Sequence, residues 1–208
     1  MPPSGLDAAV AAILAGQPVA IPTDTVYGLV STAATADGAR RIAALKSRDI
    51  AQPMALMAAS PEDLLAALPE LPPAARAMVA ELLPGPYTLV LANPAGRYAW
   101  LNGATPGAVG VRVPDLPPAA RAVLARTGAV ASTSANLHGA PAPRSFAELA
   151  PEILAGCAAA LDAGHELPGT PSTVLDLAGP QPRVIREGAA PSGPAIARAL
   201  AAAARAGA

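Results

Sequence analysis

Aromatic and charged residues are both scarce in this chain of 208 residues. Aromatic side chains make up 2% of the sequence, too few to form the stacking platform on which single-stranded nucleic acids bind. Charged residues make up 14%, and 14 basic against 15 acidic residues leave a formal net charge of −1. No overall basic field draws the chain to nucleic acid or to an anionic membrane, so any anion site has to be local.

Cysteine is nearly absent, and long apolar runs are missing. Cys157 is the only cysteine, so no disulfide can form within the chain, and we expect a reducing compartment. It lies in the apolar run AGCAAALDAG, where we expect it to pack in the core. No uncharged apolar run reaches the roughly 20 residues of a membrane helix. The N-terminal run MPPSGLDAAVAAILAG includes Asp7 and reads as an amphipathic helix rather than a signal peptide, so we expect a cytoplasmic protein.

Apolar residues, by contrast, are abundant. Hydrophobic residues make up 52% of the sequence and the mean hydropathy is +0.39, which argues against disorder in spite of 25 prolines. Many of them are alanines, which bury little area each, so the backbone has to pack closely. The length suits one domain. We expect a single domain over residues 1–208, with a core over about 6–190 and a C-terminal helix over about 195–205.

Short β-like runs alternate with helical ones along the chain. The β-like runs are brief, apolar or β-branched, and bounded by proline or glycine. The expected strands are Pro18–Pro22, Pro53–Ala58, Tyr87–Ala92, Val109–Pro114, Ala129–Ser134, Ser172–Leu177 and Arg183–Glu187. The expected helices are Leu6–Ala15, Asp37–Leu45, Pro61–Leu68, Ala74–Leu83, Pro118–Arg126, Phe146–Leu154 and Ala195–Arg205, the third with Ser60 as its cap. The alternation predicts an α/β fold with a twisted, mixed sheet flanked by helices.

Two cations stand at the end of one expected helix. Lys46 and Arg48, in the segment KSR, lie two residues apart, and in an extended chain such residues point to the same side. We therefore expect both to converge on one anion, lysine as a compact charge and arginine as a planar fork for phosphate or carboxylate. A solvated helix end, where cations also suit the helix dipole, is the alternative.

Three further polar clusters stand beside expected strand ends. The clusters offer small hydroxyl, amide or charged groups: Thr23, Asp24, Thr25 and Tyr27 in PTDTVYGL; Ser132, Ser134 and Asn136 in STSAN; and Ser172, Thr173 and Arg186 in PSTVLD and VIREG. The hydroxyl groups of the first cluster either bind a polar ligand or satisfy their own turn. Because open α/β sheets bind ligands at the carboxyl ends of their strands, we expect the groups to serve a ligand there.

Arg112 is a charge inside the otherwise apolar strand VGVRVP. Burial of an unpaired guanidinium group is costly, so Arg112 requires a ligand or a carboxylate, and Asp115 and Glu187 are the candidate partners. His138 and His165 lie in loops without an acid–base arrangement. The chain has no metal-ligand spacing and no glycine-rich phosphate loop, so a nucleotide would have to be held by scattered Arg, Lys, Ser and Asn side chains.

Seven segments, taken in order, resemble the YrdC/TsaC family of threonylcarbamoyl-AMP synthases. They are PTDTVYGL, KSR, LLPGPYTLVL, VGVRVP, STSANLHGAP, PSTVLDL and VIREGA. Each segment is weak alone, but the ordered set is specific and runs from about Ala8 to Ala189. The resemblance implies a YrdC-like twisted α/β domain with a large basic cavity, and the chain looks like the short, single-domain type of this family.

The resemblance also implies a reaction and its site. L-Threonine, bicarbonate and ATP would give L-threonylcarbamoyl-AMP and pyrophosphate, with Mg²⁺ carried by the nucleotide and no metal site in the protein. The product would pass to the downstream threonylcarbamoyl transferase machinery that makes the tRNA modification t6A37. Residue-by-residue matching assigns catalysis to Lys46, Arg48, Ser134 and Asn136; ATP binding to Lys46, Arg48, Gln52, Ser134, Asn136 and Arg186; and threonine binding to Thr25, Arg112, Ser132 and Ser172.

Four residues depart from the family pattern and affect the finer substrate contacts. Asp24 replaces the more usual Glu, and Gln52 stands where longer members often have Asn or Lys. Met57 stands where some members place a threonine-contacting histidine, and Ala142 where a serine often reaches the nucleotide.

Two other hypotheses stay open. One is an RNA-binding or ribosome-associated YrdC-like module that binds RNA weakly through the cavity; the pI of about 6.1 and the few aromatic residues count against it. The other is a carbamoyl-AMP-handling domain with a different acceptor, as in hydrogenase maturation, although the acylphosphatase-like and zinc-finger segments expected there are missing.

Overall fold

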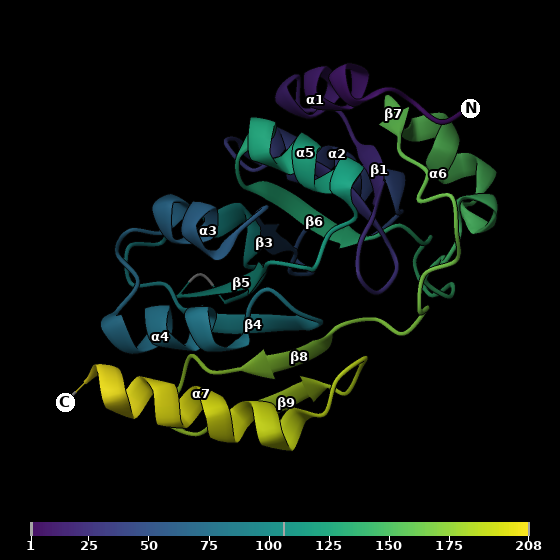
Figure 1. Cartoon of the computed structure of the whole chain (residues 1–208). Helices are drawn as coiled ribbons and strands as arrows, with labels where there is room; N and C mark the ends of the chain where they lie inside the picture. Colours follow the sequence, from purple (N-terminus) through teal and green to yellow (C-terminus); the bar gives the residue numbers. More distant parts are fainter. Residues whose placement is uncertain (1, 106, 208) are drawn as a thin grey trace.

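The computed structural model describes residues 2–105 and 107–207 (Figure 1). In this part of the chain, nine strands form one sheet in the order β7-β1-β2-β6-β3-β5-β4-β8-β9. The strands are Val19–Pro22 (β1), Tyr27–Thr32 (β2), Ala55–Met57 (β3), Tyr87–Ala92 (β4), Ala108–Arg112 (β5), Val130–Ser134 (β6), Ala159–Ala160 (β7), Thr173–Asp176 (β8) and Arg183–Arg186 (β9). Parallel and antiparallel pairs both occur, so the predicted mixed α/β sheet is confirmed.

Strand direction decides where the strand ends meet. The central strand β3 pairs with β5 in parallel and with β6 in antiparallel orientation. The carboxyl ends of β5 and β6, at Arg112 and Ser134, therefore lie at opposite ends of the sheet. These two carboxyl ends do not meet at one edge of the sheet, because β5 and β6 run in opposite directions.

Helices cover much of both sheet faces. They are Leu6–Leu14 (α1), Ala36–Leu45 (α2), Pro61–Ala67 (α3), Pro73–Leu82 (α4), Pro118–Thr127 (α5), Pro151–Gly156 (α6) and Ser192–Ala206 (α7), with short 3₁₀ turns at Ala99–Leu101 (η1) and Phe146–Glu148 (η2). Figure 1 shows α1, α2 and α5 near the β1–β2–β6 side of the sheet, and α4 beside α7 near β4, β8 and β9.

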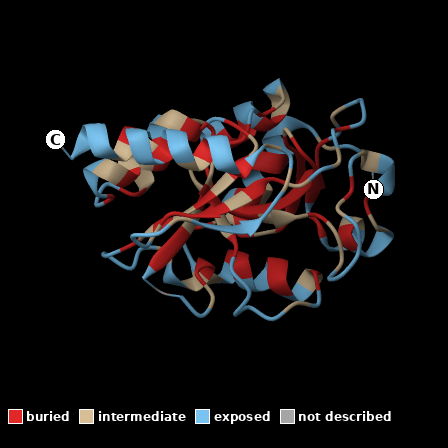
Figure 2. Ribbon diagram, turned by 90° about the horizontal axis from the view of Figure 1, so that it is seen from below, coloured by how far each residue is buried: buried red, intermediate tan, exposed pale blue. Residues whose placement is uncertain are grey.

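Alternate strand residues serve two hydrophobic layers. Leu56 and Val111 belong to the larger core, which includes inward residues of α2, α3, α4 and α7. Val30 and Val130 belong to the second core, which α1 and α5 close. Figure 2 shows buried residues in the sheet and on the inner faces of the helices, with exposed residues outside. Helices α1 and α5 cover only part of the sheet face on which they pack.

The sequence missed or misplaced several elements. Strand β2 (YGLVST) was not predicted, because it begins inside the polar segment PTDTVYGL and ends in two hydroxyl residues. It nevertheless pairs with a strand on each side. The expected helix Phe146–Leu154 is split, because Ala150 precedes Pro151 and is held in an extended conformation, so α6 begins only at that proline. Helix α7 begins at Ser192 rather than Ala195.

Other predictions are confirmed at the level of single side chains. The Ser60 hydroxyl caps α3 by accepting a hydrogen bond from the Asp63 N–H at 3.0 Å. Cys157 is buried, and burial raises the pKa of its thiol to about 12. His138 and His165 are exposed.

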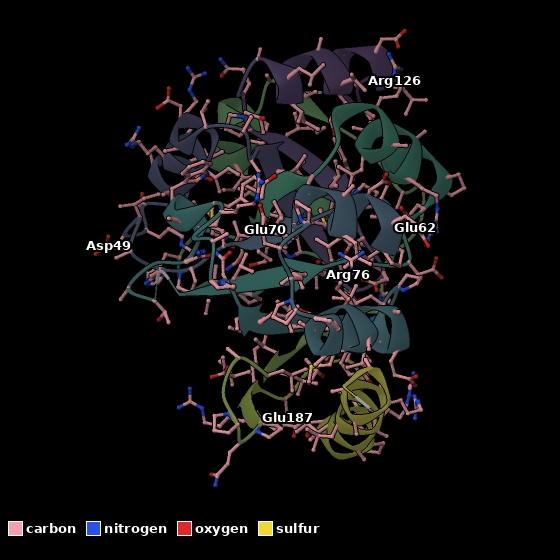
Figure 3. All side chains as sticks on the ribbon, turned by 90° about the vertical axis from the view of Figure 1, so that its left-hand side faces the viewer. Asp49, Glu62, Glu70, Arg76, Arg126 and Glu187 are labelled. Carbon is pink, nitrogen blue, oxygen red and sulfur yellow. The ribbon has the colours of Figure 1, made fainter. Side chains whose placement is uncertain are left out.

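Several charged side chains lie on the outside of the molecule. Arg126 pairs with Asp7 at 2.7 Å beside α1, whereas Glu187 lies at the other end of the molecule near α7 (Figure 3). Within residues 2–105 and 107–207, none of the helices combines the length and apolar character needed to cross a lipid bilayer.

Close packing of α2 on β2 gives a stability test. A β-carbon on Gly38 would press on the carbonyl oxygen of Thr32 and lie 2.8 Å from the Ser31 hydroxyl. Gly38→Ala should therefore lower the free energy of unfolding by about 1–3 kcal/mol, despite the better helix propensity of alanine. Gly193→Ala in α7, where no atom lies within 4 Å, is the matched control and should be neutral or slightly stabilising in the same denaturant titration. Equal effects of the two changes would contradict the packing argument.

Candidate functional site

A cavity of about 980 Å³ lies on the sheet face that α1 and α5 leave open. Its floor follows one row of register partners, Ser132 on β6, Ala55 on β3 and Gly110 on β5. The row continues to Val90 and Asp176 on β4 and β8. Because the three central side chains are small, the floor stays low and a ligand can approach the backbone.

Arg112 forms one end of the cavity. Its Nη2 donates to Asp24 Oδ1 at 2.5 Å and to Thr25 Oγ1 at 2.6 Å, and both side chains of the ion pair are 12% exposed. Desolvation lowers the pKa of Arg112, and the Asp24 carboxylate opposes this shift. Its Nε is buried and has no hydrogen-bond partner among the residues that the structure describes. A further acceptor, such as a substrate carboxylate, would satisfy it.

The partner of Arg112 is not one of the two expected from the sequence. Asp115 accepts a hydrogen bond from Arg121 at 2.9 Å, and Glu187 accepts one from the Ser192 hydroxyl. Asp24 reaches Arg112 from the turn between β1 and β2, although β6 and β3 separate β2 from β5 in the sheet.

A second arginine lies on the neighbouring wall. Arg186 Nη2 donates to the carbonyl oxygen of Ser172 at 2.7 Å and to its hydroxyl at 3.2 Å, and Thr88 Oγ1 lies 2.9 Å from the same hydroxyl. Burial lowers the pKa of Arg186. These contacts hold the guanidinium group in the cavity wall while its Nη1 makes no hydrogen bond within the described residues.

A β-bulge brings a third arginine to the cavity. The register of β8 and β9 pairs Asp176 with Arg183 and Val174 with Arg186, so Ile185 is an extra residue. In a regular strand, residues three apart face opposite sides, but here Arg183 and Arg186 both line the cavity. Arg183 also forms an ion pair with Asp176. The charged lining residues in the described chain are thus three arginines and one aspartate.

The KSR segment does not leave α2 in extended form, so that prediction is wrong. The Ser47 N–H donates to the Ala44 carbonyl and the Arg48 N–H to the Ala43 carbonyl, each at 3.0 Å, and Ser47 has φ 51°. This pattern is a Schellman motif, in which a left-handed residue ends the helix. The turn, rather than strand alternation, sets the directions of Lys46 and Arg48.

Lys46 is buried against the end of β6. Its Nζ donates to the carbonyl oxygens of Ser134 and Asn136, the latter at 2.6 Å, and lies 3.3 Å from Asn136 Oδ1. The Ser134 hydroxyl donates to the same amide oxygen. Burial, and to a smaller extent the charge of Arg48, lower the pKa of Lys46 to about 8. Three predicted catalytic residues therefore form one hydrogen-bonded cluster.

Arg48 lies on the other side of the β6 end. Its Nη1 donates to Thr133 Oγ1 at 3.0 Å, and its Nη2 to the carbonyl oxygens of Gln52 and Pro53 at 2.7 and 2.9 Å. Burial lowers the pKa of Arg48. The next residue, Asp49, lies at the periphery of the molecule (Figure 3). Arg48 thus braces the loop that follows it.

The structure brings half of the predicted site residues to the cavity wall. Those that line it are Arg112, Ser132, Ser134, Ser172 and Arg186. Those that stand behind the lining residues or outside it are Thr25, Lys46, Arg48, Gln52 and Asn136. The expectation that Lys46 and Arg48 converge on one anion is not met in this form, since both cations bond protein oxygens.

Several lining residues were not predicted. Thr88, Asn102, Asp176 and Arg183 all contribute to the cavity. Asp176 could have been found by the alternation already used for STSAN, since it lies four residues after Ser172 on the same strand face. Asn102 has no such signal, because it belongs to an irregular segment between β4 and β5. In the described part of the chain, no group of three or more His, Cys, Asp and Glu residues could hold a metal ion.

Fold and cavity together define an α/β protein with a ligand-sized hollow on the open face of a mixed sheet. The chain matches the family model Sua5_yciO_yrdC, described as "Telomere recombination", over residues 11–188. The chain therefore belongs to the Sua5/YciO/YrdC family, as its resemblance to YrdC/TsaC proteins predicted.

Relatives and solved structures agree with this assignment. The threonylcarbamoyl-AMP synthase of Stenotrophomonas maltophilia is 37% identical over 153 residues, 72% of this chain and 81% of that protein. The Pyrococcus abyssi enzyme of the same name is 32% identical over 176 residues, 85% of this chain but 52% of that protein, so the chain spans about half its length. The structure of P. abyssi Sua5 complexed with L-threonine has a TM-score of 0.78, with 32% identity and coverage of 88% and 54%. Escherichia coli YciO has a TM-score of 0.77, with 26% identity and 91% coverage of both chains.

The buried ion pair gives a test of the Arg112 environment. Asp24→Asn keeps the shape of the side chain but leaves the Arg112 guanidinium buried without its counter-charge. We expect the free energy of unfolding to fall by about 3–5 kcal/mol, as when one partner of a buried pair is removed. Asp115→Asn, which removes the exposed partner of Arg121, is the control and should change stability by less than about 1 kcal/mol in the same urea titration. Similar losses in both variants would contradict the burial argument.

Proposed function

We propose that this protein is a threonylcarbamoyl-AMP synthase, which converts L-threonine, bicarbonate and ATP into L-threonylcarbamoyl-AMP and pyrophosphate. The observation that carries the proposal is one cavity with two separate polar ends, Arg112 at one and Ser134 at the other, where Lys46 and Asn136 hold Ser134 from behind the wall. Such a hollow suits an amino acid and a nucleotide side by side. Relatives that bear this enzyme name, and the P. abyssi structure with L-threonine, support the proposal.

The Arg112 end suits the amino acid. Nε of Arg112 lacks an acceptor, and a carboxylate at this end would supply one. The hydroxyls of Ser132 and Ser172 line the same cavity and can orient the rest of threonine. Thr25 acts through Arg112 rather than on threonine itself, because its hydroxyl accepts a hydrogen bond from Arg112 Nη2 and fixes the guanidinium plane.

The other end suits the nucleotide. After the threonine amine has combined with bicarbonate and lost water, the carbamate oxygen attacks the α-phosphorus of ATP and pyrophosphate leaves. Two anions have to meet, which costs about 4 kcal/mol at close range for an effective dielectric constant near 20. Arg186, on the wall next to Arg112, can offset this repulsion and help hold the attack geometry, and Arg48 adds a charge behind the Ser134 end. Lys46 holds the Ser134–Asn136 turn and adds its charge to the same end.

Magnesium and the later steps belong to the same proposal. Asp176 is the only carboxylate among the described lining residues and already pairs with Arg183, so Mg²⁺ would arrive on the ATP phosphates rather than in a site of protein ligands. The product would serve a tRNA-modifying threonylcarbamoyl transferase in the cytoplasm. The chain fits one catalytic domain over residues 1–208.

Turnover assays test the proposal directly. The purified chain with Mg-ATP, bicarbonate, L-threonine and pyrophosphatase should release phosphate only when threonine is present. Lys46→Ala and Arg48→Ala should each lose at least about tenfold in rate, because each substitution removes a positive charge and the hydrogen bonds that hold a turn or loop in place. RNA binding that weakens with salt, together with no ATP binding, would instead identify an RNA module and contradict the synthase.

The lowered pKa of Lys46 predicts a pH dependence. Lys46 carries its charge below pH 8 and loses it above, so kcat/KM for ATP should fall as the pH rises through about 8. In Lys46→Arg the cation stays charged, so this fall should move to higher pH. Both proteins are measured in the same buffers, which cancels the titration of bicarbonate and ATP. An identical fall in the variant would show that another group titrates.

A further inference from the structure

Unpaired buried polar atoms gather in one corner of the structure. Within the described residues, six buried side-chain nitrogen or oxygen atoms have no hydrogen-bond partner, and four of them belong to Arg48, Trp100 and Asn102. Native proteins rarely bury polar groups without a partner, since each one costs the free energy of its lost hydration. Of these three residues Asn102 lines the cavity, so its two atoms are the ones whose missing partners a ligand could supply.

The two segments that carry these atoms pack against each other. The N–H of Met54, at the end of the Lys46–Pro53 loop, donates to the carbonyl oxygen of Leu101 at 2.8 Å. Gly103 lies so close to this loop that a β-carbon would overlap the carbonyl group of Ala51. The corner is therefore one unit, built from η1 with Asn102 and from the loop that Arg48 braces.

Asn102 lines the cavity, so its amide group can form hydrogen bonds with a ligand. It is 5% exposed, and neither Nδ2 nor Oδ1 makes a hydrogen bond to any residue within 2–105 and 107–207. Because the amide has no bonds to break, turning it toward the cavity sacrifices no hydrogen bond. A neighbouring asparagine in the same β4–β5 connection, Asn93, is equally buried but donates to the Arg97 carbonyl at 2.8 Å.

The amide matches a ligand edge that offers a donor and an acceptor side by side. Adenine presents such an edge, with its amino group beside a ring nitrogen, and asparagine pairs with it through two hydrogen bonds. A phosphate offers acceptors alone and would leave Oδ1 unpaired. Asn102 precedes β5, whereas Arg112 ends that strand, so the base would lie at the opposite end of the cavity from the Arg112 guanidinium.

We propose that Asn102 binds the adenine base of the nucleotide and contributes to the choice of nucleotide. This inference rests on the proposed function, because ATP is the proposed substrate, but its test measures equilibrium binding rather than turnover. Absence of threonine-dependent pyrophosphate release with normal ATP binding would count against the synthase alone. Normal turnover, together with a nucleotide affinity that does not change when Asn102 is substituted, would count against this inference alone.

Calorimetric titrations with ATP, GTP and inorganic tripolyphosphate test the proposal. Asn102→Leu keeps the size of the side chain and should weaken ATP binding by about tenfold or more, the range for loss of one bidentate base contact. Tripolyphosphate, which has no base, should bind both proteins equally. Asn102→Leu should also keep or raise the melting temperature, since it removes two unpaired buried atoms.

A second variant and a matched control complete the experiment. Asn102→Asp offers acceptors alone, which suit the two N–H groups of guanine but not the ring nitrogen of adenine, so the ratio of GTP to ATP affinity should rise about tenfold. Asn93→Leu should lower the melting temperature and leave nucleotide preference unchanged. Unchanged ATP binding in Asn102→Leu, equal losses for ATP and tripolyphosphate, or no ATP binding by the wild-type chain would each overturn the proposal.

Discussion

The buried ammonium group of Lys46 ties the end of helix α2 to the end of strand β6, and one end of the cavity depends on this link. Lys46 bonds the carbonyl oxygens of Ser134 and Asn136, and the side chains of these two residues bond each other. A turn that follows a strand has carbonyl groups that no neighbouring strand satisfies. The lysine supplies their donors and thereby sets the position of the Ser134 hydroxyl at the cavity wall.

Arg112 fulfils the corresponding role at the other end. A guanidinium group in an apolar strand is tolerated because Asp24 and Thr25 reach it from the turn between β1 and β2. The near-neutral chain therefore places Arg112 at one end of the cavity and Lys46 behind the other end. Charges on the periphery, such as the Arg126–Asp7 pair, lie far from it and are screened by solvent (Figure 3).

Much of the fold follows from local patterns in the sequence, and the exceptions have identifiable causes. Seven of the nine strands were expected near their observed places, because short apolar runs between proline and glycine mark them. β2 was missed because hydroxyl residues interrupt its apolar pattern, although both its neighbours pair with it. The Schellman turn at Ser47 was not predicted either, since a non-glycine residue rarely adopts positive φ.

The candidate site was harder to predict than the fold, since it depends on contacts between distant segments. Ser132 and Ser134 were found by alternation within one strand. The Asp24 partner of Arg112 is 88 residues away in the chain and lies in a turn whose strands do not pair with β5, so only the three-dimensional structure reveals it. The bulge at Ile185, which turns Arg183 and Arg186 to the same side, has no sequence signal comparable to a proline or glycine.

The proposed function requires the two ends of the cavity to hold L-threonine and ATP at the same time. Calorimetric titration of L-threonine into the chain, with and without a saturating non-hydrolysable ATP analogue, measures this directly. If the account is correct, threonine binds with one-to-one stoichiometry and with equal or higher affinity when the analogue is present. Loss of threonine binding in the presence of the analogue would mean that both ligands compete for one place, and would contradict the account.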